Sequence, residues 1–290
     1  KWRSGSTQRN SCIYDVIRGT TNILASETTG QNGSVSGSLT SFDSDGFTLG
    51  SWVGNNQSGS NWVSWNFKAG GTATSKTNGS ITSSVSASNG FSIVSYSGNN
   101  QSSGTIGHGL SQPPELVITK ALNLTAGWPT MAPTSYYGLR LNETGANDNT
   151  GLGSVFYNNT APTNKVYTVG GSDEVNDSYN YISYCFHSVT GKIDVGTYSG
   201  TGAVNNVITT GFQPSMVIIR GTHSAGWRIY DSTRGTDKSL RLNTFAAEYD
   251  DTSNYLEFES TGFAFRTGNT GITNSDLNGN GNTYIYIAFA

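Results

Sequence analysis

The chain has 290 residues, a formal net charge of −3 at pH 7, and only 12% charged residues, against about 25% in an average soluble protein. Its 34% hydrophobic and 11% aromatic content is too high for a disordered chain. The sparse charge excludes a basic nucleic-acid-binding surface, and no apolar run reaches the roughly 20 residues of a membrane-spanning helix. We therefore expect a folded protein with neither nucleic acid nor membrane as a partner.

Residues 1–70 match only the back half of a unit that occurs twice further on. IYDVIRGT (Ile13–Thr20) is identical to IYDSTRGT (Ile229–Thr236) at six of eight positions, and FDSDGFTLG resembles FESTGFAF. KWR at the start resembles Gly226-Trp227-Arg228, which would place Trp2, Trp128 and Trp227 at one repeat position. The chain begins without Met or a signal peptide. We favour a piece of a longer polypeptide; missing strands supplied from elsewhere are the alternative.

An aromatic phrase ends each copy of this unit. NWVSWNF stands at Asn61–Phe67, NYISYCF at Asn180–Phe186, and TYIYIAFA at Thr283–Ala290. Alternating β-branched and aromatic residues predict strands with two distinct faces. The apolar face of each strand holds Val63, Trp65 and Phe67; Ile182, Tyr184 and Phe186; and Ile285, Ile287 and Phe289. On the other face Trp62, Tyr181 and Tyr284 form an aromatic row, which we expect to pack under a second sheet or a neighbouring module, with ligand contact as the alternative.

The remaining chain reads as two full copies of the unit. Ala69–Gly90 is rich in Gly, Ser and Thr and predicts a linker with one short strand. Phe91–Lys120 then matches Ile193–Arg220, each with Tyr-Ser-Gly followed by Gln-Pro, and LRLN recurs later in both copies. No window has helical periodicity. We predict an all-β fold of tandem antiparallel β-sandwich or jelly-roll-like modules of about 100 residues, divided as 1–70, 71–189 and 190–290.

Residues that could carry chemistry are few. His108, His187 and His223 do not recur between copies and have no metal-ligand spacing. The neighbouring carboxylates Asp43/Asp45, Asp173/Glu174 and Asp250/Asp251 stand among Gly, Ser and Asn, where Asp caps turns. Cys12 and Cys185 lie in different modules and predict two free, partly buried thiols. We expect no enzyme activity, no metal and no cofactor.

One segment, DLNGNGN (Asp276–Asn282), alternates like the start of a calcium loop. The acidic ligand expected eleven positions on is Ile287, so a turn-rich hairpin loop is the favoured interpretation. Ligand contacts are expected instead in the stretches that differ most between copies, because binding residues concentrate on loops of rigid scaffolds. These stretches are Ser4–Ser11, Gly145–Asn159 and Thr267–Gly281, and the candidate contacts within them are Tyr157, Asn158, Asn159, Asn278 and Asn280. Solvated loops without a ligand are the alternative.

Several phrases resemble a known repeat domain. GSITSSVSASNGFSIVSYSG (79–98), FYNNTAPTNKVYTVGG (156–171) and NYISYCFHSVTGKIDVGTYSGTG (180–202) are similar to a domain of unknown function in tail-fibre-like and other structural proteins of marine bacteriophages, including cyanophages. The resemblance covers nearly the whole chain and implies a virion component. It supplies no catalytic residue. The polar insertion in KWRSGSTQRNSC departs from the pattern between Trp2 and Cys12.

The expected function is therefore a non-enzymatic phage structural protein: a fibre, an appendage or a decoration of the capsid surface. We expect it in the virion, bound to other virion proteins and to copies of itself, with a trimer as the candidate oligomer. Its loops would contact glycans of the host surface. The alternative is a bacterial carbohydrate-binding or adhesin module, and a polysaccharide depolymerase ranks last for want of a carboxylate pair.

Overall fold

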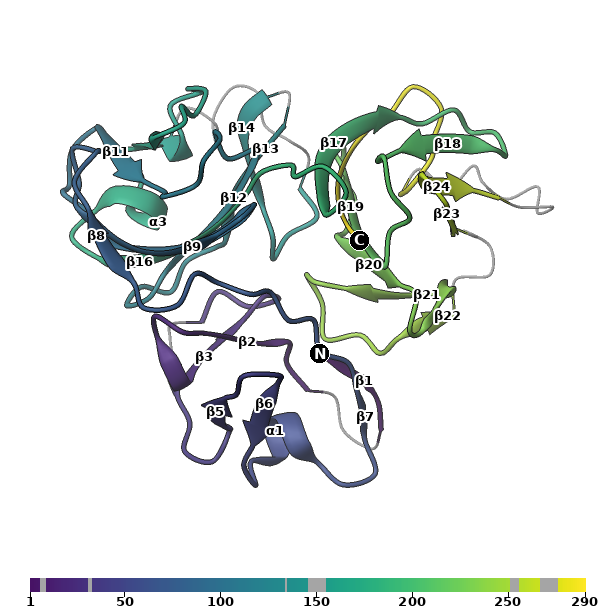
Figure 1. Cartoon of the computed structure of the whole chain (residues 1–290), viewed down its shortest axis with the longest axis horizontal. Helices are drawn as coiled ribbons and strands as arrows, with labels where there is room; N and C mark the ends of the chain where they lie inside the picture. The colour runs from purple at the N-terminus through teal and green to yellow at the C-terminus, as the bar shows by residue number, and fades with distance from the viewer. Residues whose placement is uncertain (6–8, 31–32, 134, 146–154, 251–255, 267–275) are drawn as a thin grey trace.

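The computed structural model describes residues 1–5, 9–30, 33–133, 135–145, 155–250, 256–266 and 276–290. Three lobes surround a common centre (Figure 1), and we call residues 1–70, 71–189 and 190–290 the first, second and third lobe. The described residues form antiparallel strands and two four-residue helices, α1 (Val53–Asn56) and α3 (Asp173–Asn176). The predicted all-β fold is confirmed.

The second lobe is built on a seven-stranded sheet in the order β14-β13-β12-β16-β10-β9-β8. Its strands are β8 (Thr74–Lys76), β9 (Ser83–Ser88), β10 (Phe91–Ser97), β12 (Leu116–Ala121), β13 (Pro129–Ala132), β14 (Ser135–Arg140) and β16 (Asn180–Phe186). A separate pair, β11 (Ser103–Gly107) with β15 (Val166–Gly170), forms a second sheet. The segment predicted as a linker with one short strand instead supplies two strands, β8 and β9, because its Ile81 and Val85 are buried in the core of the lobe.

The third lobe has a six-stranded sheet in the order β17-β25-β19-β20-β21-β22. Its strands are β17 (Ile193–Ser199), β19 (Met216–Gly221), β20 (Arg228–Asp231), β21 (Gly235–Arg241), β22 (Tyr249–Asp250) and β25 (Thr283–Phe289). The second sheet comprises β18 (Asn206–Thr209), β23 (Leu256–Glu259) and β24 (Gly262–Phe265).

The large sheets of these two lobes share both strand order and register. The order β10-β16-β12-β13-β14 in the second lobe corresponds to β17-β25-β19-β20-β21 in the third. Phe186 in β16 lies opposite Phe91 and Leu116. Phe289 in β25 lies opposite Ile193 and Met216 in the same way.

The first lobe is smaller. Its strands are β1 (Trp2–Ser4), β2 (Cys12–Asp15), β3 (Gly19–Ala25), β4 (Gly33–Ser34), β5 (Leu39–Phe42), β6 (Phe47–Leu49) and β7 (Asn61–Trp62), in the sheets β2-β3-β4, β5-β6 and β1-β7. Of the strand predicted for residues 61–67, only Asn61–Trp62 pairs with another strand. Among the described residues no strand of this lobe stands where β10 and β17 flank the equivalent strands of the other lobes.

The register of β1 corrects the alignment of KWR with Gly-Trp-Arg. Trp2 lies opposite Trp62, just as Ala121 lies opposite Tyr181 and Gly221 opposite Tyr284. Lys1 therefore takes the ladder position of Lys120 and Arg220, and Trp2 is not the counterpart of Trp128 or Trp227. The residue that precedes β2 at their position is Ser11, since Cys12 pairs with Ala25 as Arg228 pairs with Arg241.

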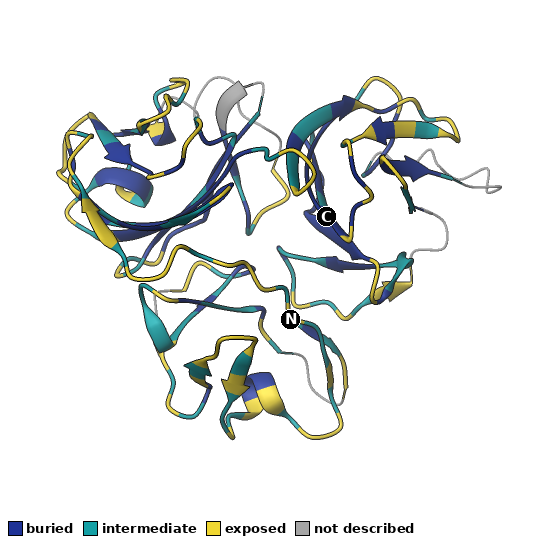
Figure 2. Cartoon of the chain, viewed as in Figure 1, coloured by how far each residue is buried: buried dark blue, intermediate teal, exposed yellow. Residues whose placement is uncertain are grey.

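The described residues form three hydrophobic cores. One lies inside the second lobe and one inside the third, where Tyr181 and Tyr284 stack on Tyr96 and Tyr198 with ring centroids 5.0 and 4.9 Å apart. The expected packing of the aromatic row is thus confirmed for both tyrosines, whereas Trp62 is half-buried. The central strands β16 and β25 are buried along all but their first residue (Figure 2).

The third core is shared by all three lobes, and here the aromatic phrases meet. Their apolar faces bring together Trp65, Tyr184 and Ile287 with residues of neighbouring lobes. Phe67, Phe186 and Phe289, one from each phrase, form a triangle with ring centroids 5.9, 6.0 and 4.9 Å apart for the pairs 67–186, 186–289 and 67–289. Each copy of the phrase contributes one face to the common centre, and in the second and third lobes its other face closes the core of the lobe itself.

Candidate functional site

The junctions between lobes contain two equivalent buried ion pairs. In the first lobe Arg18 Nε donates to Asp15 Oδ2 (2.5 Å), and Tyr184 of the second lobe donates its hydroxyl to the same oxygen (2.8 Å). In the third lobe Arg234 Nε donates to Asp231 Oδ2 (2.6 Å), which also accepts from Trp65 Nε1 of the first lobe (3.1 Å). Burial is the main cause of the raised pKa of Tyr184, so its hydroxyl stays protonated as a donor.

The remaining junction is apolar at the matching positions. In the second lobe Ala132 stands in the place of Asp15 and Asp231, as the pairing of β13 with β14 shows. In the third lobe Ile287 stands in the place of Tyr184 and Trp65, and both Ala132 and Ile287 belong to the shared core. A hydrogen-bond donor, Tyr184 or Trp65, therefore occurs where the neighbouring lobe has an aspartate. The apolar Ile287 takes this position where the aspartate is replaced by Ala132.

One cationic side chain from each lobe donates a hydrogen bond to a backbone carbonyl of another lobe. The carbonyl lies in the loop that follows the hairpin β2–β3, β13–β14 or β20–β21. Lys120 Nζ donates to the carbonyls of Ala126 (2.9 Å) and of Thr29 in the first lobe (3.4 Å). Arg220 donates to the carbonyl of Glu143 in the second lobe (3.0 Å). Lys1 Nζ donates to that of Thr244 in the third lobe (2.7 Å).

These cations are structural. Lys120 and Arg220 are fully buried and lie against Trp128 and Trp227, with 6.0 and 5.8 Å from the charged group to the ring, a favourable cation–π geometry. Burial lowers the pKa of Lys120 to about 8. A lysine with such a pKa can act as a base, but this ammonium is directed at backbone carbonyls that hold two lobes together.

The histidines also have structural contacts. His108 is fully buried between the amide of Leu110 and the carbonyl of Thr163. His187 Nε2 lies 3.4 Å from Ser111 Oγ, but its Nδ1 contacts the carbonyl of Ser188 (2.8 Å), so no carboxylate orients the ring. His223 packs edge-on against Tyr284.

Of the predicted carboxylate pairs, Asp43 and Asp45 are exposed, and Glu174 is bound to Arg140 (2.8 Å). Asp251 lies outside the described residues. Within the described part of the chain no three His, Cys, Asp or Glu side chains come together as a metal site, and no helix is long and apolar enough to cross a membrane. Cys12 and Cys185 are free thiols, as predicted, and Cys185 is fully buried.

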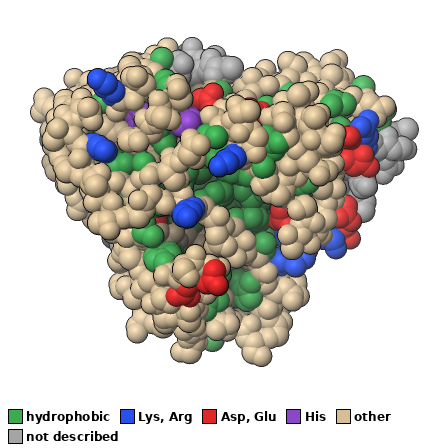
Figure 3. Space-filling model, viewed as in Figure 1, with side chains coloured by type: hydrophobic (Ala, Val, Ile, Leu, Met, Phe, Trp, Pro, Cys, Tyr) green, Lys and Arg blue, Asp and Glu red, His purple; other side chains and the backbone are tan. Residues whose placement is uncertain are grey.

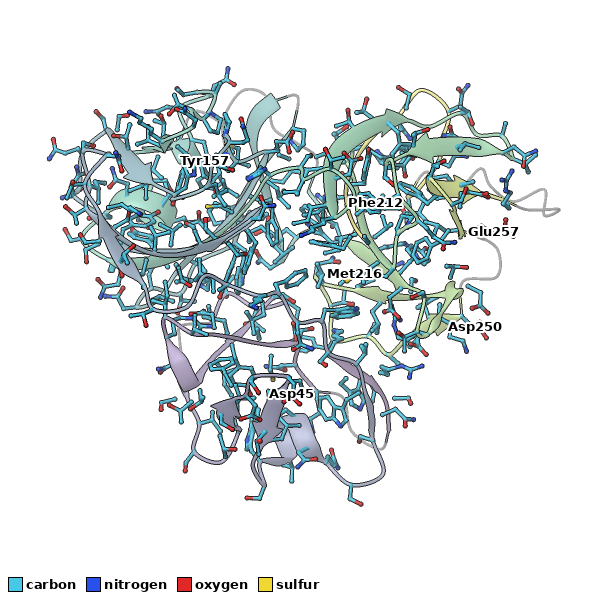
Figure 4. All side chains as sticks on the ribbon, in the orientation of Figure 1. Asp45, Tyr157, Phe212, Met216, Asp250 and Glu257 are labelled. Carbon is cyan, nitrogen blue, oxygen red and sulfur yellow. The ribbon has the colours of Figure 1, made fainter. Side chains whose placement is uncertain are left out.

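Two of the five predicted ligand contacts are wrong. Tyr157 is fully buried inside the second lobe (Figure 4), where its hydroxyl donates to the carbonyl of Pro129 (2.9 Å). Asn278 is also fully buried; it accepts from the amide of Thr201 (3.0 Å) and donates to the carbonyl of Ala203 (2.9 Å), which fixes the loop after β17. Both side chains are buried and hydrogen-bonded within the fold, so they are not accessible to a sugar.

The other three candidates are accessible but scattered. Asn158 is half-buried, whereas Asn159 and Asn280 are exposed. Asn158 and Asn159 have φ of 51° and 46°, values that suit Asn better than most residues. Asn280 lies in the turn preceding β25, in a different lobe. Asp276, the first residue of the suspected calcium loop, pairs with Arg228 (3.0 Å). Most of the variable stretches around these residues (6–8, 146–154 and 267–275) lie outside the described residues.

An open groove with a volume of about 540 Å³ is a candidate site in the described structure. It lies between the β2–β3 hairpin of the first lobe and the sheet of the second lobe, along β8, β9, β10 and β16. Ser75, Ser84 and Ser95 pair with one another across three neighbouring strands and line it. Sequence reasoning missed this site because its serines resemble linker residues and the hairpin opposite them comes from another lobe.

The exterior of the molecule carries few charged side chains. Figure 3 shows a face dominated by uncharged polar groups, with apolar side chains visible in the hollow where the lobes meet. Phe67, one of the three residues of the phenylalanine triangle, is 39% exposed.

The fold and these sites define an all-β protein whose antiparallel sheets surround a shared centre. The profile of one family, described as a domain of unknown function (DUF7483), matches residues 1–290. The chain belongs to that family. Neither the curated proteins nor the solved structures contain a significant match.

Proposed function

We propose that the chain is a non-enzymatic structural protein of a bacteriophage virion, located in a fibre, an appendage or a capsid-surface decoration. The resemblance of its phrases at residues 79–98, 156–171 and 180–202 to repeats of marine phage structural proteins supports this proposal. Its partners would be other virion proteins and copies of itself.

The observation that carries the non-enzymatic part is how the polar core groups are used. Asp15–Arg18, Asp231–Arg234 and Lys120 are among the buried charges an active site would draw on. Each is committed to a junction between lobes. A scaffold of this kind suits a particle in seawater, because exposed ion pairs contribute little when salt screens them.

Mass spectrometry of gradient-purified particles from a phage that encodes the chain tests the proposal. We expect the chain at a copy number matching a structural component, together with labelling of particles by an antibody against it. Its absence from particles, with abundance in the lysate or on uninfected bacteria, would contradict the proposal and favour the alternative function.

That alternative is a bacterial carbohydrate-binding or adhesin module, and the hydroxyl-lined groove is the observation that favours it. Such a module would bind sugars without needing any virion. Location on a bacterial surface, rather than sugar binding as such, separates the two proposals.

A further inference from the structure

We infer that the groove between the first and second lobes is a binding site for a neutral oligosaccharide. This inference rests on the proposed non-enzymatic function, because the sugar would be held and not cleaved. It moves glycan recognition from the loops predicted from sequence to the face of a sheet.

The floor of the groove is a row of hydroxyl groups. Ser75 in β8 lies opposite Ser84 in β9, which lies opposite Ser95 in β10. Because neighbouring strands are about 4.8 Å apart, the row presents a regular line of donors and acceptors. Ser84 and Ser95 are half-buried and Ser75 is exposed.

These three hydroxyls differ from other serines of the same strands. Ser83, on the opposite face of β9, donates to the carbonyl of Gly107, and Ser86, on the same face as Ser84, donates to that of Gly71. No described residue forms a hydrogen bond with the side chain of Ser75, Ser84 or Ser95. Their hydrogen-bonding capacity is therefore open to a ligand or to water.

The walls combine amide and apolar groups. Asn22 from the first lobe and Asn180 from β16 line the groove. Their amides are held in place, because Asn22 Nδ2 donates to the carbonyl of Arg18 and Asn180 Oδ1 accepts from Ser97 Oγ. Ile17 and Leu122 are partly buried and pack against the shared core, so they offer fixed apolar surface. A sugar ring has hydroxyl groups at its edge and C–H groups on its faces, and this mixture matches both.

The electrostatics favour a neutral ligand. Arg18 is the charged residue of the lining, and its guanidinium donates to Asp15 Oδ2 (2.5 Å) and to the carbonyls of Asn22 (2.9 Å) and Ile13 (3.0 Å). With its charge balanced by Asp15 and these donors occupied, it has little to offer an anion. The groove also lacks an aromatic platform, because Tyr96 and Tyr181 direct their hydroxyls into the second lobe, to the carbonyls of Val175 and Asp173.

Size and position are consistent with this assignment. Small-molecule sites have volumes of about 300–1,000 Å³, and the groove has about 540 Å³. The third lobe has no equivalent, since its sheet ends at β17 with no described strand in the place of β8 and β9. Thr197 on β17 matches Ser95, because it lies opposite Ile285 as Ser95 lies opposite Ile182.

Methyl NMR on the full chain tests the inference, with Ile17 and Leu122 as reporters in the groove and Ile208, buried in the third lobe, as a remote reporter. The probes are maltotriose, cellotriose and chitotriose, with trigalacturonate as the anionic comparison. We expect at least one neutral probe to shift Ile17 and Leu122 in a saturable way, and not Ile208. Analysis of the sugar afterwards should show no cleavage.

The double variant Ser84→Ala/Ser95→Ala should weaken that binding at least tenfold. Its melting temperature should stay within a few degrees, because these hydroxyls support no described contact. Thr197→Ala is the matched control and should bind like the unaltered chain. The inference is overturned if no neutral probe shifts the groove reporters, if the double variant binds equally well, or if trigalacturonate binds as strongly. Such a result leaves the virion proposal intact, since that depends on the composition of particles.

Discussion

Trp65 Nε1 donates a hydrogen bond to Asp231 Oδ2 across 166 positions of sequence (3.1 Å). The bond joins the first lobe to the third and has a counterpart between Tyr184 and Asp15. At the remaining junction, where Ala132 replaces the aspartate, the aromatic donor is replaced by Ile287. At each junction the side chain of one lobe is thus matched to the residue it meets in the next lobe. The contribution of these contacts to stability can be tested.

Asp15→Ala is expected to destabilise the chain by about 3–5 kcal/mol, the usual cost of leaving one partner of a buried ion pair alone. The side chains of Arg18 and Asp15 are only 4% and 2% exposed. Urea denaturation at pH 7 measures the effect. Asp45→Ala, at an exposed turn, is the control and should change stability by no more than about 0.5 kcal/mol. Equal effects for both variants would show that the buried pair contributes nothing.

Phe186→Ala should cost about 3–5 kcal/mol, the range for removing a buried phenylalanine. Its ring contacts Phe67, Phe91 and Phe289, so the cavity would open into all three lobes. Phe245→Ala is the control, because Phe245 is 42% exposed. If thermal unfolding shifts by the same small amount for both, the phenylalanine triangle is not a structural centre.

Lys120 should make a contribution to stability that rises with pH between about 8 and 9.5. Its pKa is lowered from 10.5 to about 8 in the folded chain, so in this window the unfolded chain binds more protons and deprotonation favours folding. One pKa unit corresponds to about 1.4 kcal/mol, which gives a gain of about 1–2 kcal/mol. The raised pKa values of the thiols of Cys12 and Cys185 act in the opposite direction within this window, and those of buried tyrosines such as Tyr184 do so toward pH 10. The contribution of Lys120 is therefore measured against a variant that differs only there.

Lys120→Arg is the variant that isolates this effect. Arginine stays protonated and already occupies the equivalent position in the third lobe, as Arg220. Chemical denaturation of both proteins at about pH 8 and 9.5 should show that the unaltered chain gains about 1–2 kcal/mol of stability relative to the variant, because the other titrating groups are common to both. An identical pH profile for the variant would mean that Lys120 is not the titrating group.

The two thiols should be unreactive in the folded chain. Burial raises the pKa of Cys185 to about 12 and that of Cys12 to about 11, and the thiolate is the reactive form. Labelling with iodoacetamide at about pH 8 should modify neither residue in native buffer and both in denaturant. Rapid native labelling of Cys185 would contradict its burial in the second lobe.

The strands and the repeated unit could be predicted from sequence because period-two alternation and turn residues are local signals. The alignment of KWR with Gly-Trp-Arg was wrong because it relied on the match between tryptophans. The correct match, of Lys1 with Lys120 and Arg220, is weak in sequence and becomes visible only from the strand register. Tyr157 and Asn278 were misplaced for a related reason. A polar side chain in a variable loop looks free in sequence, but the fold can bury it against backbone groups.

The junctions were partly visible in the sequence. IYDVIRGT and IYDSTRGT share an Asp and an Arg three positions apart, and this spacing returns as Asp15–Arg18 and Asp231–Arg234. Their partners Tyr184 and Trp65 could not be found in the same way, because they come from other lobes and contact the aspartates only after the chain has closed around its centre.

Native-state hydrogen exchange on Phe289→Ala tests most directly the claim that the three lobes are one cooperative unit around a shared core. Phe289 belongs to the third lobe, whereas β16 belongs to the second. We predict that the free energy of exchange for amides of β16 and of β25 falls by the same amount. A loss of protection confined to β25, with β16 unchanged, would show that the lobes are independent and that the shared core does not hold them together.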